Sequence, residues 1–141
     1  PTRRSSDLFI LREESEGSCL KNKIETYFQA WVNNEISCMD QLFNDETYYS
    51  ECYGPEYHGI NELKRWFKDW HQHGDVLEWK IKDMWQLGHK WMVEWHFKCI
   101  YDEKADEFDG VSLICFDENN KIISLKEFES KSQHYSPYCK K

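Results

Sequence analysis

The sequence has no excess of positive charge and no long apolar run. Its 18 Lys and Arg residues stand against 26 Asp and Glu residues, which gives a formal net charge of −8 at pH 7. The chain therefore has no basic stripe for a phosphate backbone, and neither nucleic acid nor an anionic membrane surface is expected as a partner. The longest stretch without a charged residue is 26–34, far shorter than the roughly 20 apolar residues that cross a bilayer. We expect a soluble protein.

The six cysteines lack a diagnostic spacing. None belongs to a C-x-x-C pair, and no secretory leader with an apolar centre precedes them, so we expect reduced thiols in a cytoplasmic protein. Their even number leaves a disulfide framework as the alternative. Gly-rich phosphate loops and Ser or Cys nucleophile motifs are missing too, and no cofactor is predicted.

Aromatic residues, in contrast, are abundant. The chain has 7 Trp, 8 Tyr and 8 Phe, or 16% of its residues, which suffices for a core or for a lined cavity and argues against intrinsic disorder. A chain of 141 residues is most simply one domain. Residues 1–8 show no periodicity and resemble a translated sequencing adapter. We therefore predict a non-native or disordered segment at 1–17 and a single domain at 18–141.

Apolar periodicity predicts three helices. The first has a continuous apolar face at Leu20, Ile24, Tyr27, Phe28 and Trp31, and it ends at 33–34. A capping box formed by Ser37 and Asp40 predicts a short second helix that reaches residue 43. The third helix is predicted over 59–74, between two glycines.

Five strands are predicted from alternating or β-favouring residues, at 47–53, 77–87, 91–101, 108–116 and 121–129. In the second of these the odd positions form an apolar face that Asp83 interrupts. The order α-α-β-α-β-β-β-β predicts an α+β fold. Its helices pack on a strongly curved, mostly antiparallel sheet and close it into a cone-shaped barrel.

Several short segments carry a family resemblance. They are 27–31, 42–43, 54–55, 59, 63–67, 110–113 and 121–124. Together, between about Asn22 and Tyr138, they resemble the SnoaL-like branch of the nuclear-transport-factor-two-like superfamily, which includes ketosteroid isomerases and polyketide cyclases. The resemblance implies the cone-shaped fold, a cavity for a small apolar or aromatic ligand, and a homodimer.

The resemblance also implies two catalytic residues. A gapless alignment puts Tyr27 at the isomerases' oxyanion donor and Glu51 at their general base. Their second oxyanion donor corresponds to Ser112, a weaker donor, and Glu51 is one methylene longer than the family's base, so steroid isomerisation is not expected. The alternatives are a core tyrosine at 27 that bonds a strand carbonyl, and an outward-facing Glu51.

Further pocket residues are predicted from the apolar faces. Four tryptophans on these faces either fill a core or line an open cavity: Trp31, Trp66, Trp70 and Trp95. His71, four residues after Phe67, is predicted at the cavity edge. Asp83 is either a buried site carboxylate or an Asp near a strand end that pairs with a neighbour.

A metal site is not predicted. His71 and His73, with Cys52 or His58 as further ligands, have the residue types for one. However, a spacing of i, i+2 on a helix points the two imidazoles apart.

The sequence thus predicts a small-molecule-binding domain with an aromatic-lined pocket. If it is an enzyme, its chemistry is isomerase- or cyclase-type proton transfer with a carboxylate base. The alternative is a non-catalytic dimeric binding or assembly module of the same fold. That module would use the mixed outer strand face of Met92, Glu94, His96 and Lys98.

Overall fold

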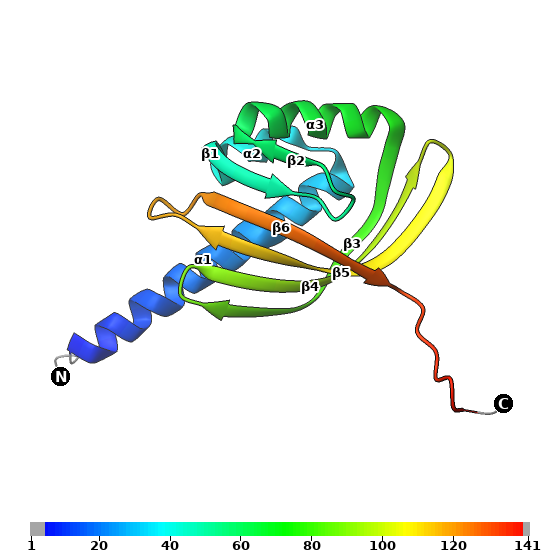
Figure 1. Cartoon of the computed structure of the whole chain (residues 1–141). Coiled ribbons are helices and arrows are strands. Elements are labelled where there is room, and N and C mark those ends of the chain that lie inside the picture. The colour runs from blue at the N-terminus through cyan, green and yellow to red at the C-terminus, as the bar shows by residue number, and fades with distance from the viewer. Residues whose placement is uncertain (1–4, 140–141) are drawn as a thin grey trace.

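The computed structural model describes residues 5–139, with side chains from residue 16 onward. Within this range, helices lie against a single six-stranded sheet (Figure 1). The helical elements are α1 (Ser5–Asn33), the 3-10 turn η1 (Ile36–Cys38), α2 (Met39–Leu42) and α3 (Gly59–His73). The strands are β1 (Phe43–Ser50), β2 (Glu56–His58), β3 (Gly74–Leu87), β4 (Lys90–Tyr101), β5 (Lys104–Phe116) and β6 (Ile122–Lys131).

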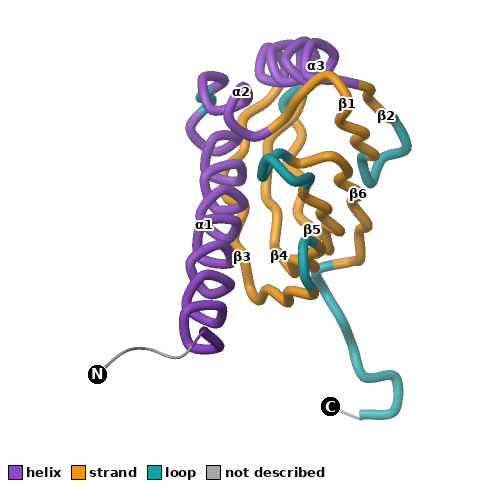
Figure 2. The backbone as a smooth tube through the Cα atoms, turned by 90° about the vertical axis from the view of Figure 1, so that its left-hand side faces the viewer, coloured by secondary structure: helices purple, strands orange, loops and turns teal. Residues whose placement is uncertain are grey.

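The sheet is mostly antiparallel and strongly curved. Its strand order is β2-β1-β6-β5-β4-β3, and β1 and β6 form the one parallel pair among the described strands. Helix α1 runs beside β3, and α3 lies across the end of the sheet near β1 and β2 (Figure 2). This arrangement confirms the predicted cone-shaped α+β fold.

The predicted apolar face of α1 is confirmed. Leu20, Ile24, Tyr27, Phe28 and Trp31 are all buried in the core. The backbone of α1 begins at Ser5, well before the first periodic residue. Residues 1–4 lie outside the described part of the chain, and the domain boundary at residue 18 stays a prediction.

The alternation predicted for β3 is wrong over much of the strand. Irregularities in its pairing with β4, between Val76 and Glu78 and between Ile81 and Asp83, each change which side chains face inward. A single period of two therefore does not hold, and the large apolar side chains that it predicted to be buried are exposed at Leu77, Trp85 and Leu87. In β4, whose ladder with β5 is regular, the predicted alternation is confirmed from Trp91 to Cys99, whereas Tyr101 at the strand end is exposed.

Between α1 and α3 the structure differs from the sequence predictions at three smaller points. The capping box at Ser37 is wrong, because the chain forms η1 there and the N-cap of α2, Cys38, makes no side-chain capping bond. Strand β1 begins at Phe43 rather than at residue 47. The short strand β2 was not predicted; it pairs with β1 after the turn at Gly54, whose φ of 109° favours glycine.

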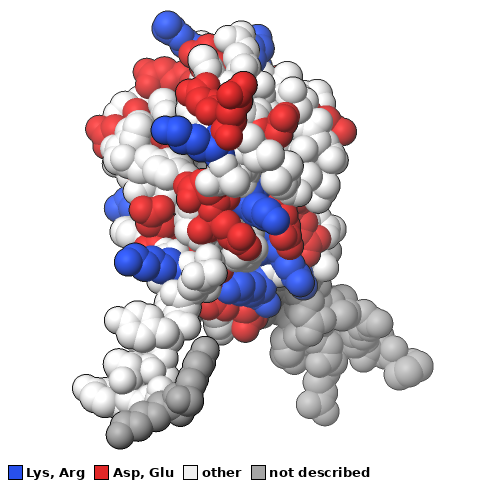
Figure 3. Space-filling model, turned by 90° about the vertical axis from the view of Figure 1, so that its right-hand side faces the viewer, with Lys and Arg blue, Asp and Glu red and all other residues white. Residues whose placement is uncertain are grey.

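All six cysteines are free in the structure. No helix in the described part of the chain has the length and apolar character needed to span a bilayer. On the face drawn in Figure 3, acidic and basic side chains are interspersed without a continuous basic stripe. The cytoplasmic location stays a prediction.

Candidate functional site

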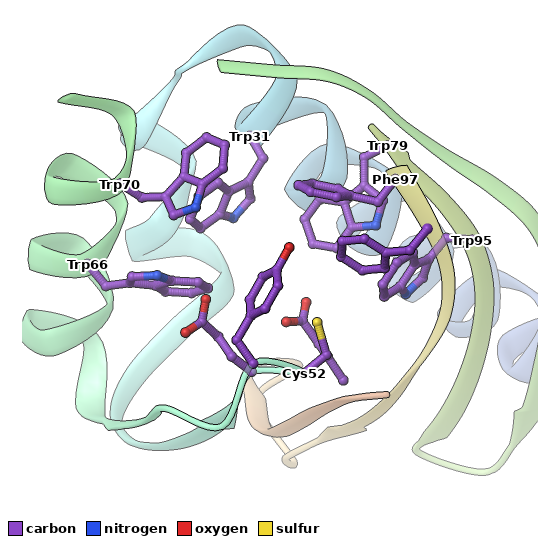
Figure 4. Close-up of a pocket in the computed structure, with 11 residues that line it drawn as sticks. Trp31, Cys52, Trp66, Trp70, Trp79, Trp95 and Phe97 are labelled. Carbon is purple, nitrogen blue, oxygen red and sulfur yellow. The ribbon is translucent and has the colours of Figure 1, made fainter. Parts of the chain in front are cut away.

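The concave side of the sheet encloses a small cavity, which we call the inner pocket. Its volume is about 40 Å³. One wall comes from α1 and α3 and consists of Trp31, Trp66 and Trp70, while the opposite wall comes from β3, β4 and β5 and consists of Trp79, Trp95, Phe97 and Phe108. Figure 4 shows the labelled rings of the two walls facing each other, with Cys52 below the space between them.

Ring packing holds both walls in place. The centroid of Trp31 lies 4.6 Å from that of Trp66 and 5.5 Å from that of Trp70. Behind the opposite wall, Trp79 stacks on Phe28 at 4.0 Å. The Trp79 indole N–H is buried and has no hydrogen-bond partner among the described residues. Packing rather than hydrogen bonding therefore fixes this ring.

A wider hollow, which we call the outer groove, adjoins the inner pocket. It has a volume of about 1090 Å³ and lies between α3 and the ends of β4 and β5. The two hollows share Glu51, Tyr53, Trp66 and Trp70 in their linings. Because a dry cavity that admits benzene measures about 150 Å³, the inner pocket has room for a small group, and the rest of a ligand would lie in the groove.

Glu127, on β6, is a carboxylic acid at the inner pocket that sequence reasoning missed. The Tyr49 hydroxyl donates a hydrogen bond to Glu127 Oε2 at 2.8 Å. The pKa of Glu127 is raised to about 8, chiefly by burial and also by the charge of Glu51, while hydrogen bonds from Tyr49 and the Cys52 backbone oppose the rise. Glu127 therefore carries its proton at neutral pH.

Glu51 is the second carboxyl group at the inner pocket. It follows β1 directly, is 9% exposed and faces inward, so the alternative of an outward-facing Glu51 is wrong. The Tyr57 hydroxyl donates to Glu51 Oε2 at 3.0 Å. Burial raises the pKa of Glu51, and hydrogen bonding from Tyr57 and Trp66 opposes the rise. Two carboxyl groups with raised pKa values thus line one small cavity.

Tyr27 lies behind Tyr49 rather than at the pocket surface. Its hydroxyl donates to the Tyr49 hydroxyl at 2.7 Å, and both side chains are fully buried. Burial and the charge of Glu127 raise the pKa of both tyrosines. Tyr27, Tyr49 and Glu127 therefore form one hydrogen-bonded chain that ends at the pocket.

The matching family model is that of the SnoaL-like domain, and it covers residues 24–125. This chain belongs to the SnoaL-like family. The comparison with curated proteins gives no match.

Solved structures with the same fold are distant in sequence from this SnoaL-like domain. A ketosteroid-isomerase-like protein from Catenulispora acidiphila, in complex with trimethylamine, is 14% identical, with a TM-score of 0.67 over 75% of this chain and 83% of the other. An LEH-like epoxide hydrolase from M. tuberculosis is 15% identical, with a TM-score of 0.69 over 77% and 80%. An NTF-2 like protein of unknown function from Burkholderia xenovorans is 14% identical, with a TM-score of 0.67 over 84% and 88%.

The SnoaL-like domain brings most of the sequence-predicted pocket residues together. Glu51 and the four predicted tryptophans all line the inner pocket. Ser112 is fully buried beside it and accepts a hydrogen bond from Trp95 Nε1 at 2.9 Å. Ser112 therefore orients a wall residue and does not face the cavity as a donor.

Two predicted residues lie elsewhere in the domain. His71 places both ring nitrogens within 2.9 Å of carbonyl oxygens, those of Phe67 and Trp31, and so joins α3 to α1. Asp83 is exposed and pairs across the ladder with Glu94, because the irregularity after Ile81 turns it away from the inner pocket. It lines a separate hollow beside α1.

One signal in the sequence would have indicated Glu127. It lies two residues after Leu125, and positions two apart on a strand share a face. Leu125 is fully buried, so a carboxylate at 127 points toward the same interior.

Among the described residues, no group of three His, Cys, Asp or Glu side chains is arranged to hold a metal ion.

Proposed function

We propose that this SnoaL-like domain binds a small molecule in the inner pocket and catalyses a proton transfer on it. The observation that carries the proposal is the pair of inward-facing carboxyl groups, Glu51 and Glu127, in an aromatic cavity. A carboxyl group with a pKa near neutrality is suited to both giving and taking a proton. Glu127, with a pKa of about 8, has this property.

The two carboxyl groups take different parts in the proposed reaction. Glu127 holds the proton at neutral pH and acts as the acid, with Tyr49 and Tyr27 stabilising its anion after the proton has left. Glu51 lies where the inner pocket meets the outer groove and acts as the general base. Tyr27 supports Glu127 through Tyr49, in place of the direct oxyanion role that the family alignment implies.

Proton transfer can be tested before the natural substrate is known. The protein is incubated in D₂O with cyclic and unsaturated ketones, and NMR follows deuterium entering the carbon next to the carbonyl. We expect exchange that falls by about 10² or more in Glu127→Gln and in Glu51→Gln, because removing a positioned acid or base costs this much. Glu129→Gln, an exposed residue on the same strand, is the control and should retain the wild-type rate. Unchanged exchange in Glu127→Gln would contradict its role.

A second candidate function is a dimeric binding module. It is favoured by a row of exposed apolar side chains on the outer face of the sheet, where Trp85, Met92 and Leu113 are neighbours across β3, β4 and β5. We expect sedimentation equilibrium to give twice the chain mass of 17.2 kDa, and Leu113→Glu to give the monomer, because a charge in an apolar interface is costly. A monomeric wild type at micromolar concentration would exclude this candidate.

A further inference from the structure

We propose that the mouth of the inner pocket, where it meets the outer groove, receives the head of an organic cation, a tertiary or quaternary ammonium group. The proposal rests on the proposed small-molecule site and names its ligand class. The aromatic walls, the acidic lining and the size of the two hollows support it.

Aromatic rings line the inner pocket on both sides. The two walls contribute five Trp and two Phe rings, and Trp31 links them, since its centroid is 4.6 Å from Trp66 on one side and 6.4 Å from Trp79 on the other. The face of an aromatic ring carries partial negative charge and attracts a cation within about 6 Å of its centroid. A head at the mouth of the inner pocket would lie beside Trp66 and Trp70, which line both hollows.

The acidic and basic side chains of the inner pocket are all of one kind. Its described lining contains Glu51 and Glu127 and no Lys, Arg or His. An anion would face two carboxyl groups without a counter-charge. A neutral ligand would leave the Glu51 carboxylate without a counter-charge, whereas a cation supplies one and also favours the ionised form of Glu127.

The outer groove also has more acidic than basic side chains in its lining. Its lining carries the carboxylates of Glu51, Glu62, Asp69 and Asp106 against the cations Arg65 and Lys104. With a net charge of −8 on the whole chain, the approach to the pocket attracts positive ligands and repels negative ones.

Size places the head at the mouth of the inner pocket. A cavity of about 40 Å³ is well below the roughly 150 Å³ that holds a benzene ring, and a trimethylammonium head is about as wide as that ring. One methyl group of the head therefore enters the inner pocket, while its nitrogen lies near Glu51, Trp66 and Trp70, which line both hollows. The remainder of the ligand would occupy the outer groove.

Binding of such a head has a consequence for Glu127. The groups that face its carboxyl are Tyr49 from β1 and Glu51 and Cys52 from the following turn, with Tyr27 behind Tyr49. None of them brings positive charge. A bound cation stabilises the Glu127 anion, so the carboxyl gives up its proton more readily. A substrate accepts this proton in the proposed reaction, whereas a ligand such as choline offers no acceptor and the proton leaves to the buffer. Choline binding near pH 7 should therefore release close to one proton.

The test compares choline with 3,3-dimethylbutan-1-ol, which has the same shape and a carbon in place of the charged nitrogen. Calorimetric titrations at pH 7 in two buffers of different protonation enthalpy give the affinity and the number of protons released. We expect choline to bind at least 10-fold more tightly than the alcohol and to release a proton that Glu127→Gln does not release. Equal affinities would overturn the proposal.

Variants at the pocket rim test the aromatic contribution. Trp70→Leu should weaken choline binding about 3- to 30-fold, the range of one cation–π contact, while Trp70→Phe retains most of it. Trp85→Leu, on the outer face of the sheet, is the control and should leave the affinity unchanged. An equal effect of Trp70→Leu and Trp70→Phe would show that the aromatic ring of Trp70 does not contribute to cation binding and would overturn the proposal.

The outcomes separate this inference from the proposed function. If the alcohol or one of the ketones binds and choline does not, the small-molecule site stands and the cation assignment is wrong. If no compound binds and no deuterium exchange occurs, both are wrong.

Discussion

Replacing Gly110 with Ala is expected to lower the free energy of unfolding by about 3 kcal/mol. A Cβ at this position on β5 would lie 2.5 Å from the Phe128 carbonyl oxygen and 2.6 Å from Trp95 Cζ2. The carbonyl belongs to the β6 backbone and the Trp95 ring is 1% exposed, so neither atom can move away without disturbing the core. Only a residue without a side chain lets the ring lie across the sheet here.

Urea denaturation followed by far-UV circular dichroism measures this loss. Gly17→Ala is a useful comparison, because Gly17 lies within α1 and its new methyl group would meet only the end of the Gln86 side chain. That change should be neutral or stabilising by up to about 1 kcal/mol. A Gly110→Ala variant as stable as the wild type would show that the Trp95 ring is not fixed against β5.

Glu127→Gln is expected to remove a pH dependence of stability. In the folded protein the pKa of Glu127 is about 8, against an ordinary glutamate value of 4.5. Between these values the folded state binds more protons than the unfolded state, so stability decreases as the pH rises through this window. Between pH 5 and pH 8 the wild type should lose about 3.5 kcal/mol more than the variant, which carries no titrating group at this position.

Urea titrations at several pH values test this expectation. Other groups, such as His96 on the outer face, titrate in both proteins and cancel in the difference. Glu129→Gln should keep the wild-type slope, since this residue is exposed. Parallel stability curves for wild type and Glu127→Gln would mean that Glu127 is ionised in the folded protein, which would also remove the basis of its role as an acid.

The parts of the fold that follow a regular period could be predicted from sequence. The α1 face from Leu20 to Trp31 and the alternation of β4 are both confirmed, because an unbroken helix and a regular ladder keep their period. In β3 the pairing irregularities depend on the partner strand. Its own sequence therefore could not place Trp85 or Asp83 on the outer face.

The site was predictable where a single element determines it. Trp31, Trp66 and Trp70 follow from helical periodicity, and Glu51 from the family alignment. Glu127 was missed because, although it shares a strand face with Leu125, the charged residues Lys126, Glu127 and Glu129 do not show that this face stays buried so far along β6. That face is determined by pairing with β5, where Glu127 lies opposite the buried Ser112.

The parallel pairing of β1 with β6 determines when the pocket forms during folding. Tyr49 on β1 and Glu127 on β6 are in contact but 78 residues apart in the chain, and all the other strands and α3 lie between them. Closing so long a segment is entropically costly and belongs to the late steps of folding. The chain through β6 must therefore be synthesised before the two carboxyl groups can meet, and no fragment of this domain that ends before β6 can contain the site.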